Sequence, residues 1–403
     1  MIADAARARW GIVALILTAQ TLANIGPLGI PAIASLIRDD LGLTLAQAGS
    51  FLSAYYVGPA LLSLPAGTLA DSWGIKRTLV LGQLVIGLGL IAVSLSGSYA
   101  MLVLLMALAG CGYGLLNPTS TKAVILWSPP SQRATLVGLK QVGLPLGGAI
   151  GAVLLPVLAL ALGWRPAVVL SGLVIAITAV ASLLVYRDPP GMPAPATAAG
   201  ARSAVREVLS TRDLWLVAVA TGGFAATQTV WMAFLVLYLH EHVEVSLLAA
   251  ARYLALAQVA GMAGRVVFGM LSDRLFGGRR RLPLAIAGCG SALCSLAIAF
   301  TGPGASALLL VPLAAVFGFV GIGWNGVQHT LMAELAGARA AGTAVGLGLA
   351  ISSVGVTIGP LIFGHFVSVS GGFRGPWIAL ALMMAAALAL LSLVRERRRF
   401  DIA

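Results

Sequence analysis

Long apolar runs separated by short charged turns dominate this sequence and restrict what the chain can fold into. An α-helix needs about 20 predominantly apolar residues to cross a bilayer. Twelve runs meet that requirement: 10–37, 45–70, 78–97, 99–127, 132–161, 165–186, 213–240, 246–272, 282–301, 304–333, 340–369 and 375–394. Only 9% of the residues are charged, against about 25% in a soluble domain. The runs therefore predict an all-α membrane protein with twelve transmembrane helices.

The basic residues predict how these helices are oriented. Most of the 25 Lys and Arg residues fall between the runs or towards their ends, on the side that also carries both termini, and Lys122 is assigned to that side. The other side holds only Arg38, Arg165, Arg252 and Arg374. By the positive-inside rule, both termini are expected in the cytoplasm, with the chain in the bacterial inner membrane. Topology also accounts for the net charge of +12, so no nucleic-acid partner is expected.

A Pro- and Ala-rich linker, 187–212, divides the chain into two halves of six runs, 1–186 and 213–403. The linker contains one amphipathic turn, at 202–209. The halves repeat each other: Gly67 and Asp71 match Gly269 and Asp273 at an offset of 202, and a second set matches at an offset of 208. That second set pairs Thr135, Gly138, Gly147 and Gly151 with Thr343, Gly346, Gly355 and Gly359. Parallel repeats that enclose a site near the bilayer midplane are typical of secondary transporters.

The turn after the second run reads GTLADSWGIKR, in which Gly67, Asp71, Gly74, Lys76 and Arg77 are spaced as glycine-x3-aspartate-x2-glycine-x-basic-basic. A looser copy, GMLSDRLFGGRR, contains Gly269 and Asp273. An aspartate at the end of a span can also sit against the positive N-terminus of a neighbouring helix.

These two motifs, with the repeat and the twelve runs, resemble the major facilitator superfamily over essentially the whole chain. The resemblance implies a fold of two pseudo-symmetric six-helix domains that transports by alternating access. It also implies that the motif residues act in gating, latching the cytoplasmic side while the outer side is open. Within the superfamily, GLKQVGLPLGGAIGA and AGRVVFGMLSDR look most like the cyanate-permease-like and oxalate/monocarboxylate porter branches.

Two basic residues lie inside apolar runs. Arg265 precedes Asp273 by eight residues, about 12 Å along a helix, and Lys140 follows Gln132 by eight. A charge at that depth is costly and usually faces a cavity or a partner. All thirteen acidic residues fall in loops or near the ends of runs. We therefore expect the two cations to face each other across a central cavity and bind an anion, because a guanidinium offers a carboxylate two parallel hydrogen bonds.

Other polar and aromatic residues inside the runs are candidates for the same substrate site. Such residues either line a transport pathway or hold helices together by hydrogen bonds, and the sequence leaves both roles open. The candidates are Gln141, Tyr55, Tyr113, Asn117, Gln228, Trp231, Trp324 and Asn325. His329 and His365 also lie inside runs, and the sequence does not decide whether either carries protons.

The sequence thus predicts a secondary active transporter for a small organic anion, with a carboxylate as the expected class. Transport would be coupled to protons or occur by exchange, and a monomer would suffice. The alternative is a proton-driven exporter of neutral or amphipathic compounds of the multidrug type; a membrane receptor or scaffold is a third possibility. An enzyme is not expected, because no nucleophile–base set, metal-ligand cluster or phosphate-binding loop occurs. No cofactor is expected either.

Overall fold

The computed structural model describes residues 2–44, 47–48, 50–188 and 198–396, and the regular elements of these segments are helices. Eleven helical segments of the described part are long and apolar enough to cross a bilayer. The remaining span is α4 (Phe51–Ser72), whose two internal prolines and two adjacent tyrosines make it less apolar. The predicted all-α fold with twelve membrane helices is confirmed.

Several spans consist of more than one helix. The first half contains α1 (Ile2–Gly29), α2 (Ala34–Leu41), α4, α5 (Ile75–Val93), α6 (Tyr99–Trp127), α7 (Arg133–Gln141), α8 (Gly143–Leu162) and α9 (Trp164–Val185). The second half contains α11 (Arg212–Glu241), α12 (Leu247–Met270), α13 (Arg281–Ala299), α14 (Ala307–Phe317), α15 (Asn325–Ala336), α16 (Ala341–Ser370) and α17 (Arg374–Ser392). Between the halves, the amphipathic turn predicted at 202–209 is part of a full helix, α10 (Ala198–Ser210). Residues 189–197 of the predicted linker lie outside the described residues.

Three spans are interrupted, two of them at or near a proline. The first span passes from α1 to α2 through a 3₁₀ turn that contains Pro31. The fifth breaks at Val142, between α7 and α8 and three residues before Pro145. The tenth passes from α14 to α15 through a π-helical turn, Gly318–Ile322. Such breaks are tolerated in a membrane where neighbouring helices satisfy the freed backbone groups.

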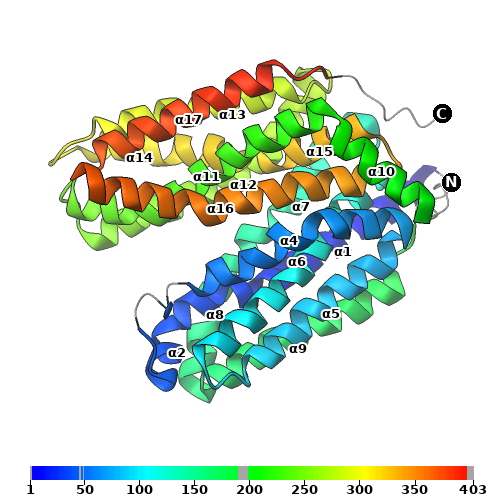
Figure 1. The fold of residues 1–403 in the computed structure, drawn as a ribbon, viewed down its shortest axis with the longest axis horizontal. Coiled ribbons are helices and arrows are strands. Elements are labelled where there is room, and N and C mark those ends of the chain that lie inside the picture. Colours follow the sequence, from blue (N-terminus) through cyan, green and yellow to red (C-terminus); the bar gives the residue numbers. More distant parts are fainter. Residues whose placement is uncertain (1, 45–46, 49, 189–197, 397–403) are drawn as a thin grey trace.

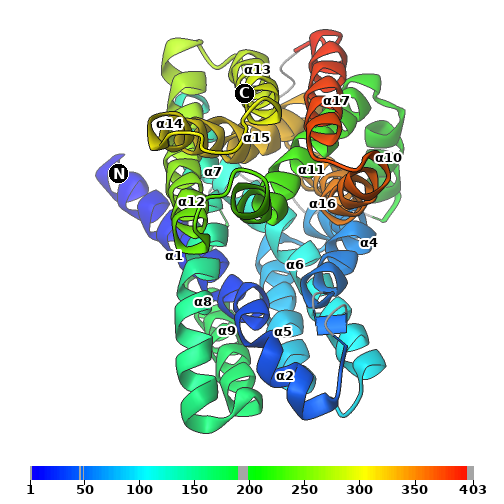
Figure 2. The same ribbon diagram turned by 90° about the vertical axis from the view of Figure 1, so that its left-hand side faces the viewer.

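The two halves form separate groups of helices in Figure 1, with the first half below and the second half above. They meet where α4 crosses α16 and where α7 crosses α12, pairs that lie side by side in Figure 2. These crossings are close: a Cβ on Gly67 would lie 2.0 Å from the carbonyl oxygen of Gly342, and one on Gly138 would lie 2.1 Å from that of Arg265. Small residues allow such backbone approach. The boundaries 1–186, 187–212 and 213–403 stay predictions.

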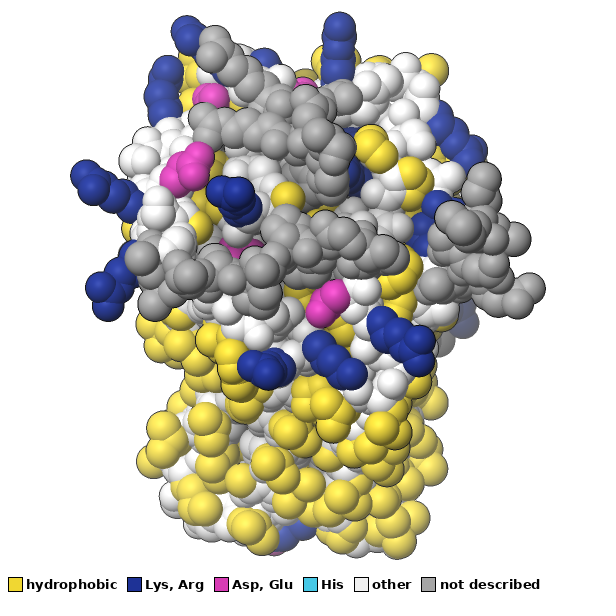
Figure 3. Space-filling view, turned by 90° about the vertical axis from the view of Figure 1, so that its right-hand side faces the viewer, with side chains coloured by type: hydrophobic (Ala, Val, Ile, Leu, Met, Phe, Trp, Pro, Cys, Tyr) yellow, Lys and Arg dark blue, Asp and Glu magenta, His cyan; other side chains and the backbone are white. Residues whose placement is uncertain are grey.

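The start of α1 and the end of α17 lie at the same end of the molecule (Figure 1), as an even number of spans requires. Figure 3 looks onto this end, where Lys and Arg side chains gather around the rim and hydrophobic side chains cover the flank below. We call this end the terminal side. Arg77, Arg202 and Arg206 are among its exposed basic residues.

Candidate functional site

A small cavity lies between the two halves and is lined by helices of both. Its volume is about 60 Å³, room for a few water molecules. Six of the predicted substrate-binding residues line it: Tyr113, Asn117, Gln141, Gln228, Trp324 and Asn325. The amide groups of Asn325 and Gln228 meet across it, with Asn325 Nδ2 donating to Gln228 Oε1 at 3.2 Å. The structure therefore brings most of the predicted polar residues to one place.

Lys140, on α7, is fully buried behind the wall of this cavity. Its ammonium donates to the Asn117 backbone carbonyl at 3.3 Å and to Asn117 Oδ1. It also donates to Thr121 Oγ1 and Gln141 Oε1, both at 3.2 Å. An ammonium has three N–H groups, so four oxygens share them. None of the four oxygens carries a formal charge.

Arg265, on α12, is also buried. A residue at position 145 would normally donate its N–H to the Gln141 carbonyl four residues earlier, but Pro145 has no N–H. Arg265 takes the place of that donor, with Nη1 2.5 Å from the Gln141 carbonyl oxygen. Its Nε has no hydrogen-bond partner among the described residues. The break between α7 and α8 thus supplies the acceptor that holds the guanidinium.

The two cations converge on Gln141, instead of facing each other across the cavity as the sequence predicted. Neither is among the cavity-lining residues. The reason is the close crossing of α7 and α12 at Gly138, which brings together the two helices that carry these side chains. Within the described residues, no carboxylate forms an ion pair with either cation. A buried site with two uncompensated positive charges is complementary to an anion, because an unpaired buried charge is strongly unfavourable.

His329, on α15, lines the cavity and is buried. Its Nδ1 lies 3.0 Å from Gln141 Nε2 and 3.5 Å from Thr121 Oγ1, so it shares both neighbours with Lys140. His365, in contrast, is exposed on α16. The sequence contains the signal that separates them, since His329 follows Asn325 by one helical turn and so lies on the same face of α15.

The sequence analysis missed several further lining residues: Tyr56, Leu144, Ala225, Leu349, Ser352, Ser353 and Val356. Ser352 and Ser353 form an adjacent polar pair in an apolar run, a signal that could have found them. The sequence alone could not show that Tyr56, and not its neighbour Tyr55, lines the cavity. That depends on how α4 is rotated about its own axis.

Besides Lys140 and Arg265, two more of the predicted substrate-binding residues do not line the cavity. Trp231 is buried in a separate aromatic cluster, stacked on Phe317 with ring centroids 3.8 Å apart. Its Nε1 donates to Ser295 Oγ at 3.0 Å. Tyr55 packs behind the wall, with its ring 5.9 Å from that of Tyr113. Both lie on helices that line the cavity, but on faces turned away from it.

Asp71 joins the two halves on the terminal side. This buried carboxylate, at the end of α4, accepts hydrogen bonds from the backbone N–H groups of Gly342 and Thr343 at 3.1 and 2.9 Å. Thr343 Oγ1 donates to it at 2.6 Å. Asp71 therefore caps the N-terminus of α16, where the helix dipole favours a negative charge. The position predicted for it, against a neighbouring helix N-terminus, is the one observed.

The Asp71 carboxylate also pairs with Lys122 at 2.7 Å. Lys122 is buried within α6, five residues before that helix ends at Trp127. It therefore lies on the side to which the sequence analysis assigned it, but inside the helix bundle and not in the turn between two runs. Hydropathy alone could not reveal the partner that makes its burial possible.

Asp273 makes the equivalent contact from the second half. It accepts from the Thr135 N–H at 2.8 Å and from Thr135 Oγ1 at 2.7 Å, at the N-terminus of α7. Arg280 donates both to Asp273 and to Glu334, the latter at 2.9 and 3.0 Å. Burial alone would lower the pKa of the Arg280 guanidinium, but its contacts with Glu334 and Asp273 raise this pKa overall. Two reciprocal caps thus join the two halves on the terminal side.

The other motif residues surround these caps. Gly74 adopts φ +99° at the start of α5, a conformation that favours glycine. A Cβ on Gly269 would lie 2.4 Å from the carbonyl oxygen of Ala134, where α12 crosses α7. Lys76 is half-buried, and Arg77 is exposed on the terminal side.

An all-helical membrane protein whose two related halves enclose a polar site has the architecture of secondary transporters. Residues 13–360 match the family model of the Major Facilitator Superfamily. The chain belongs to this superfamily, which confirms the resemblance found in its motifs.

Several characterised or named relatives match the chain over most of its length. The probable sulfoacetate transporter of Cupriavidus necator is 29% identical, over 92% of this chain and 90% of the relative. The hexuronate transporter of Bacillus subtilis is 26% identical, over 90% of this chain and 89% of the relative. The gallate transporter of Pseudomonas putida is 28% identical, over 91% and 88% respectively.

Solved structures share the fold. The Escherichia coli fucose:proton symporter superposes with a TM-score of 0.78 at 18% identity, covering 96% of this chain and 98% of that protein. The human organic anion transporter MFSD10 superposes with a TM-score of 0.76 at 16% identity, covering 95% and 99%. At this identity the likeness concerns the fold alone.

Proposed function

We propose that this protein moves a small organic anion, with a carboxylate as the expected class, across the bacterial inner membrane by alternating access. One observation carries the proposal: Lys140 and Arg265 are both fully buried beside the interhalf cavity, and only neutral oxygens accept their hydrogen bonds. An anion entering the site would supply the missing negative charge. The names of the relatives support this class, since sulfoacetate, hexuronate and gallate are all organic acids.

In this proposal, Arg265 and Lys140 bind the charged group and Gln141 holds the two cations at a fixed spacing. The remaining contacts would come from the other predicted residues that line the cavity: Tyr113, Asn117, Gln228, Trp324 and Asn325. The cavity of about 60 Å³ is too small for a hexuronate-sized solute. Substrate entry would therefore require the halves to separate on the side opposite the termini.

Gating would rest on the two aspartate caps. Asp71 and Asp273 hold the terminal side closed here, and transport to that side requires both contacts to break. Gly67 and Gly269 would let the crossing helices slide at these points, and Gly74, Lys76 and Arg77 would set the end of α4 at the membrane surface. We place this side in the cytoplasm, because its basic residues are those that the positive-inside rule retains there.

Coupling to protons has two candidate carriers. One is the carboxyl group of the substrate itself, which would enter protonated or accept a proton in the site. The other is His329, whose Nδ1 lies 3.0 Å from the Gln141 amide that also contacts Lys140. A bound anion would offset the field of Lys140 and Arg265 and so favour a proton on His329. Exchange of one anion for another would need neither carrier.

The test is uptake into proteoliposomes by wild-type protein and by Arg265→Gln, Arg265→Lys and Lys140→Met. The panel contains a carboxylate, a sulfonate, a neutral sugar and an organic cation, each with and without a pH gradient. We expect saturable uptake of the anions only. Removing either charge should lower kcat/KM for the anions by about a hundredfold, the value of one or two charge-assisted hydrogen bonds. Arg265→Lys should retain part of the activity.

The matched control is Arg252→Gln, an exposed arginine on the same helix, which should leave uptake unchanged. His329→Gln separates the coupling routes: loss of pH-gradient stimulation for the sulfonate would assign the proton to His329. Full anion uptake by Arg265→Gln would refute the proposed binding role. Uptake of the neutral or cationic solute, unaffected by these variants, would instead favour the alternative exporter.

A further inference from the structure

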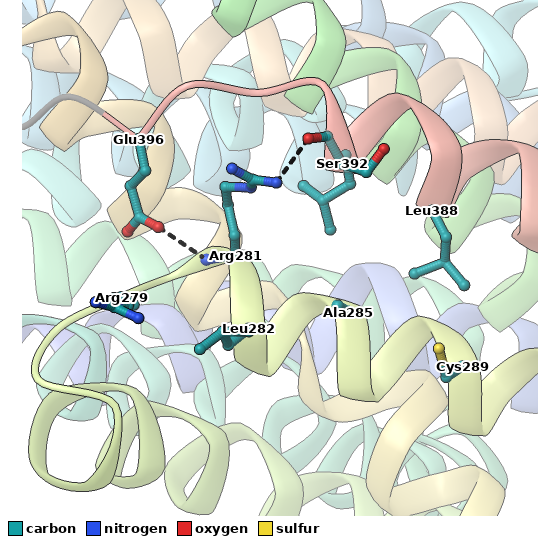
Figure 4. A pocket seen from close by; sticks show the side chains of 9 residues that line it. Arg279, Arg281, Leu282, Ala285, Cys289, Leu388, Ser392 and Glu396 are labelled. Atoms are coloured by element: carbon teal, nitrogen blue, oxygen red, sulfur yellow. Dashed lines mark hydrogen bonds between the residues drawn. The ribbon is translucent and has the colours of Figure 1, made fainter.

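A second and larger hollow lies at the membrane surface, between α13 and α17. Its volume is about 690 Å³. Figure 4 shows its two ends: Arg279, Arg281 and Glu396 surround the mouth, and the groove continues between the facing sides of the two helices. It is lined by residues of the second half only and is separate from the interhalf cavity.

The position of the groove relative to the bilayer follows from its helices. Both α13 and α17 are membrane spans; α13 begins at Arg281 and α17 ends at Ser392. The mouth therefore lies where both helices leave the hydrocarbon, on the terminal side. From there the groove extends to Cys289, eight residues along α13, or about 12 Å into the hydrocarbon. Leu282 and Leu388 are among its apolar walls.

The mouth offers two guanidinium groups for which the described part of the chain supplies no ion-pair partner. Arg281 Nη2 donates to the Ser392 carbonyl at 2.7 Å. The Nε of the same guanidinium is buried and has no hydrogen-bond partner among the described residues. Arg279 is exposed, and no ion pair of the described residues includes its guanidinium. Among the described residues that line the mouth, the one carboxylate is Glu396, which accepts the backbone N–H groups of Arg280 and Arg281 at 2.6 and 3.4 Å. Glu396 thus caps α13 and leaves both guanidinium groups available.

We propose that this groove binds an anionic phospholipid from the leaflet on the terminal side. The phosphate contacts Arg279 and Arg281, and one acyl chain lies along Leu282 and Leu388 towards Cys289. Guanidinium groups are suited to phosphate oxygens, and basic pockets between helices at this level are suited to anionic headgroups. A soluble phosphate would satisfy only the mouth, whereas a phospholipid also fills the apolar groove below it. The proposal is independent of the transported substrate.

Native mass spectrometry of the purified protein, titrated with phosphatidylglycerol or phosphatidylcholine, tests this proposal. We expect tighter binding of phosphatidylglycerol. The double variant Arg279→Gln/Arg281→Gln should bind it about thirtyfold more weakly, and Arg279→Gln alone about fivefold, from the usual contribution of a basic residue at an anionic membrane surface. The single variant removes an exposed side chain that forms no ion pair with any described residue, so it remains informative if the double variant folds poorly.

The matched control is Arg202→Gln/Arg206→Gln, which removes two exposed arginines from α10 on the same side of the molecule and should bind as the wild type does. Cys289→Trp keeps the charges but fills the groove, and should also weaken phosphatidylglycerol binding. Glycerol 3-phosphate, which has the headgroup chemistry without acyl chains, should not compete. Equal binding of the two lipids, effective competition by glycerol 3-phosphate, or wild-type binding by Arg279→Gln/Arg281→Gln would each overturn the proposal.

Discussion

Lys122, Lys140 and Arg265 are all buried within membrane helices, but their surroundings differ. Lys122 has a carboxylate partner, Asp71, at 2.7 Å. The hydrogen bonds of Lys140 and Arg265 within the described part of the chain go to neutral oxygens. A paired buried cation needs no ligand, whereas an unpaired one does. At the residue scale, this difference is the reason for which we propose a structural role on the terminal side for Lys122 and a role in substrate binding for the other two.

Asp71→Asn tests the structural half of this assignment. The variant keeps an oxygen for the α16 N-terminus but leaves Lys122 buried without its counterion. We expect the free energy of unfolding in detergent to fall by about 3–5 kcal/mol, as when one partner of a buried pair is removed. Asp39→Asn is the control, because Asp39 pairs with Arg38 at the exposed surface and should change stability by less than about 1 kcal/mol. Thermal unfolding that is equally unaffected in both variants would contradict the structural role of the pair.

At the scale of elements, the break in the fifth span links one residue of the sequence, Pro145, to the position of Arg265. The missing N–H of Pro145 frees the Gln141 carbonyl, and Arg265 from the other half uses it. The sequence contained Pro145, Gln141 and Arg265, yet their contact could not be predicted. It depends on which helix crosses the break, and local sequence does not encode that.

Pro145→Ala restores an N–H that can compete with Arg265 for this carbonyl. We expect a folded protein whose KM for the anion rises about tenfold, the effect of one weakened hydrogen bond to a charged group. Pro156→Ala is the control: Pro156 lies within α8, beyond the break. Uptake measured over a range of substrate concentrations distinguishes the two. An unchanged KM in Pro145→Ala would mean that the break does not position Arg265.

The sequence predicted the bounds of the helices better than it predicted which face of a helix turns towards the cavity. The run 99–127 coincides with α6, and the other helical bounds lie close to the predicted ranges. The breaks at Val142 and in Gly318–Ile322 were not predicted, because hydropathy averages over them. Trp231 was assigned to the substrate site because hydropathy does not record the rotation of a helix about its axis. Asp71 was placed correctly because its motif defines both a helix end and a charge.

At the scale of the whole molecule, the two crossings between the halves have the same close backbone approach, but they carry different side-chain charges. A Cβ on Gly346 would lie 2.1 Å from the Ser63 carbonyl oxygen, as one on Gly138 would from that of Arg265. By the internal repeat, Ser63 corresponds to Arg265 at an offset of 202, and Gly348 to Lys140 at an offset of 208. The symmetric backbone is suited to rocking of one half against the other. The asymmetric charges are the reason for which we propose the substrate at the crossing of α7 and α12.

If transport proceeds by such rocking, a covalent link across the other crossing must stop it. Thr68 on α4 and Thr343 on α16 are suitable positions, since their hydroxyl oxygens lie 3.4 Å apart across the halves. In a background with Cys111, Cys289 and Cys294 replaced by serine, we expect oxidation of Thr68→Cys/Thr343→Cys to form a disulfide and arrest anion uptake. A reductant should restore uptake, and each single-cysteine variant should be insensitive to oxidation. Undiminished uptake by fully cross-linked protein would rule out an opening between α4 and α16 as a step of the transport cycle.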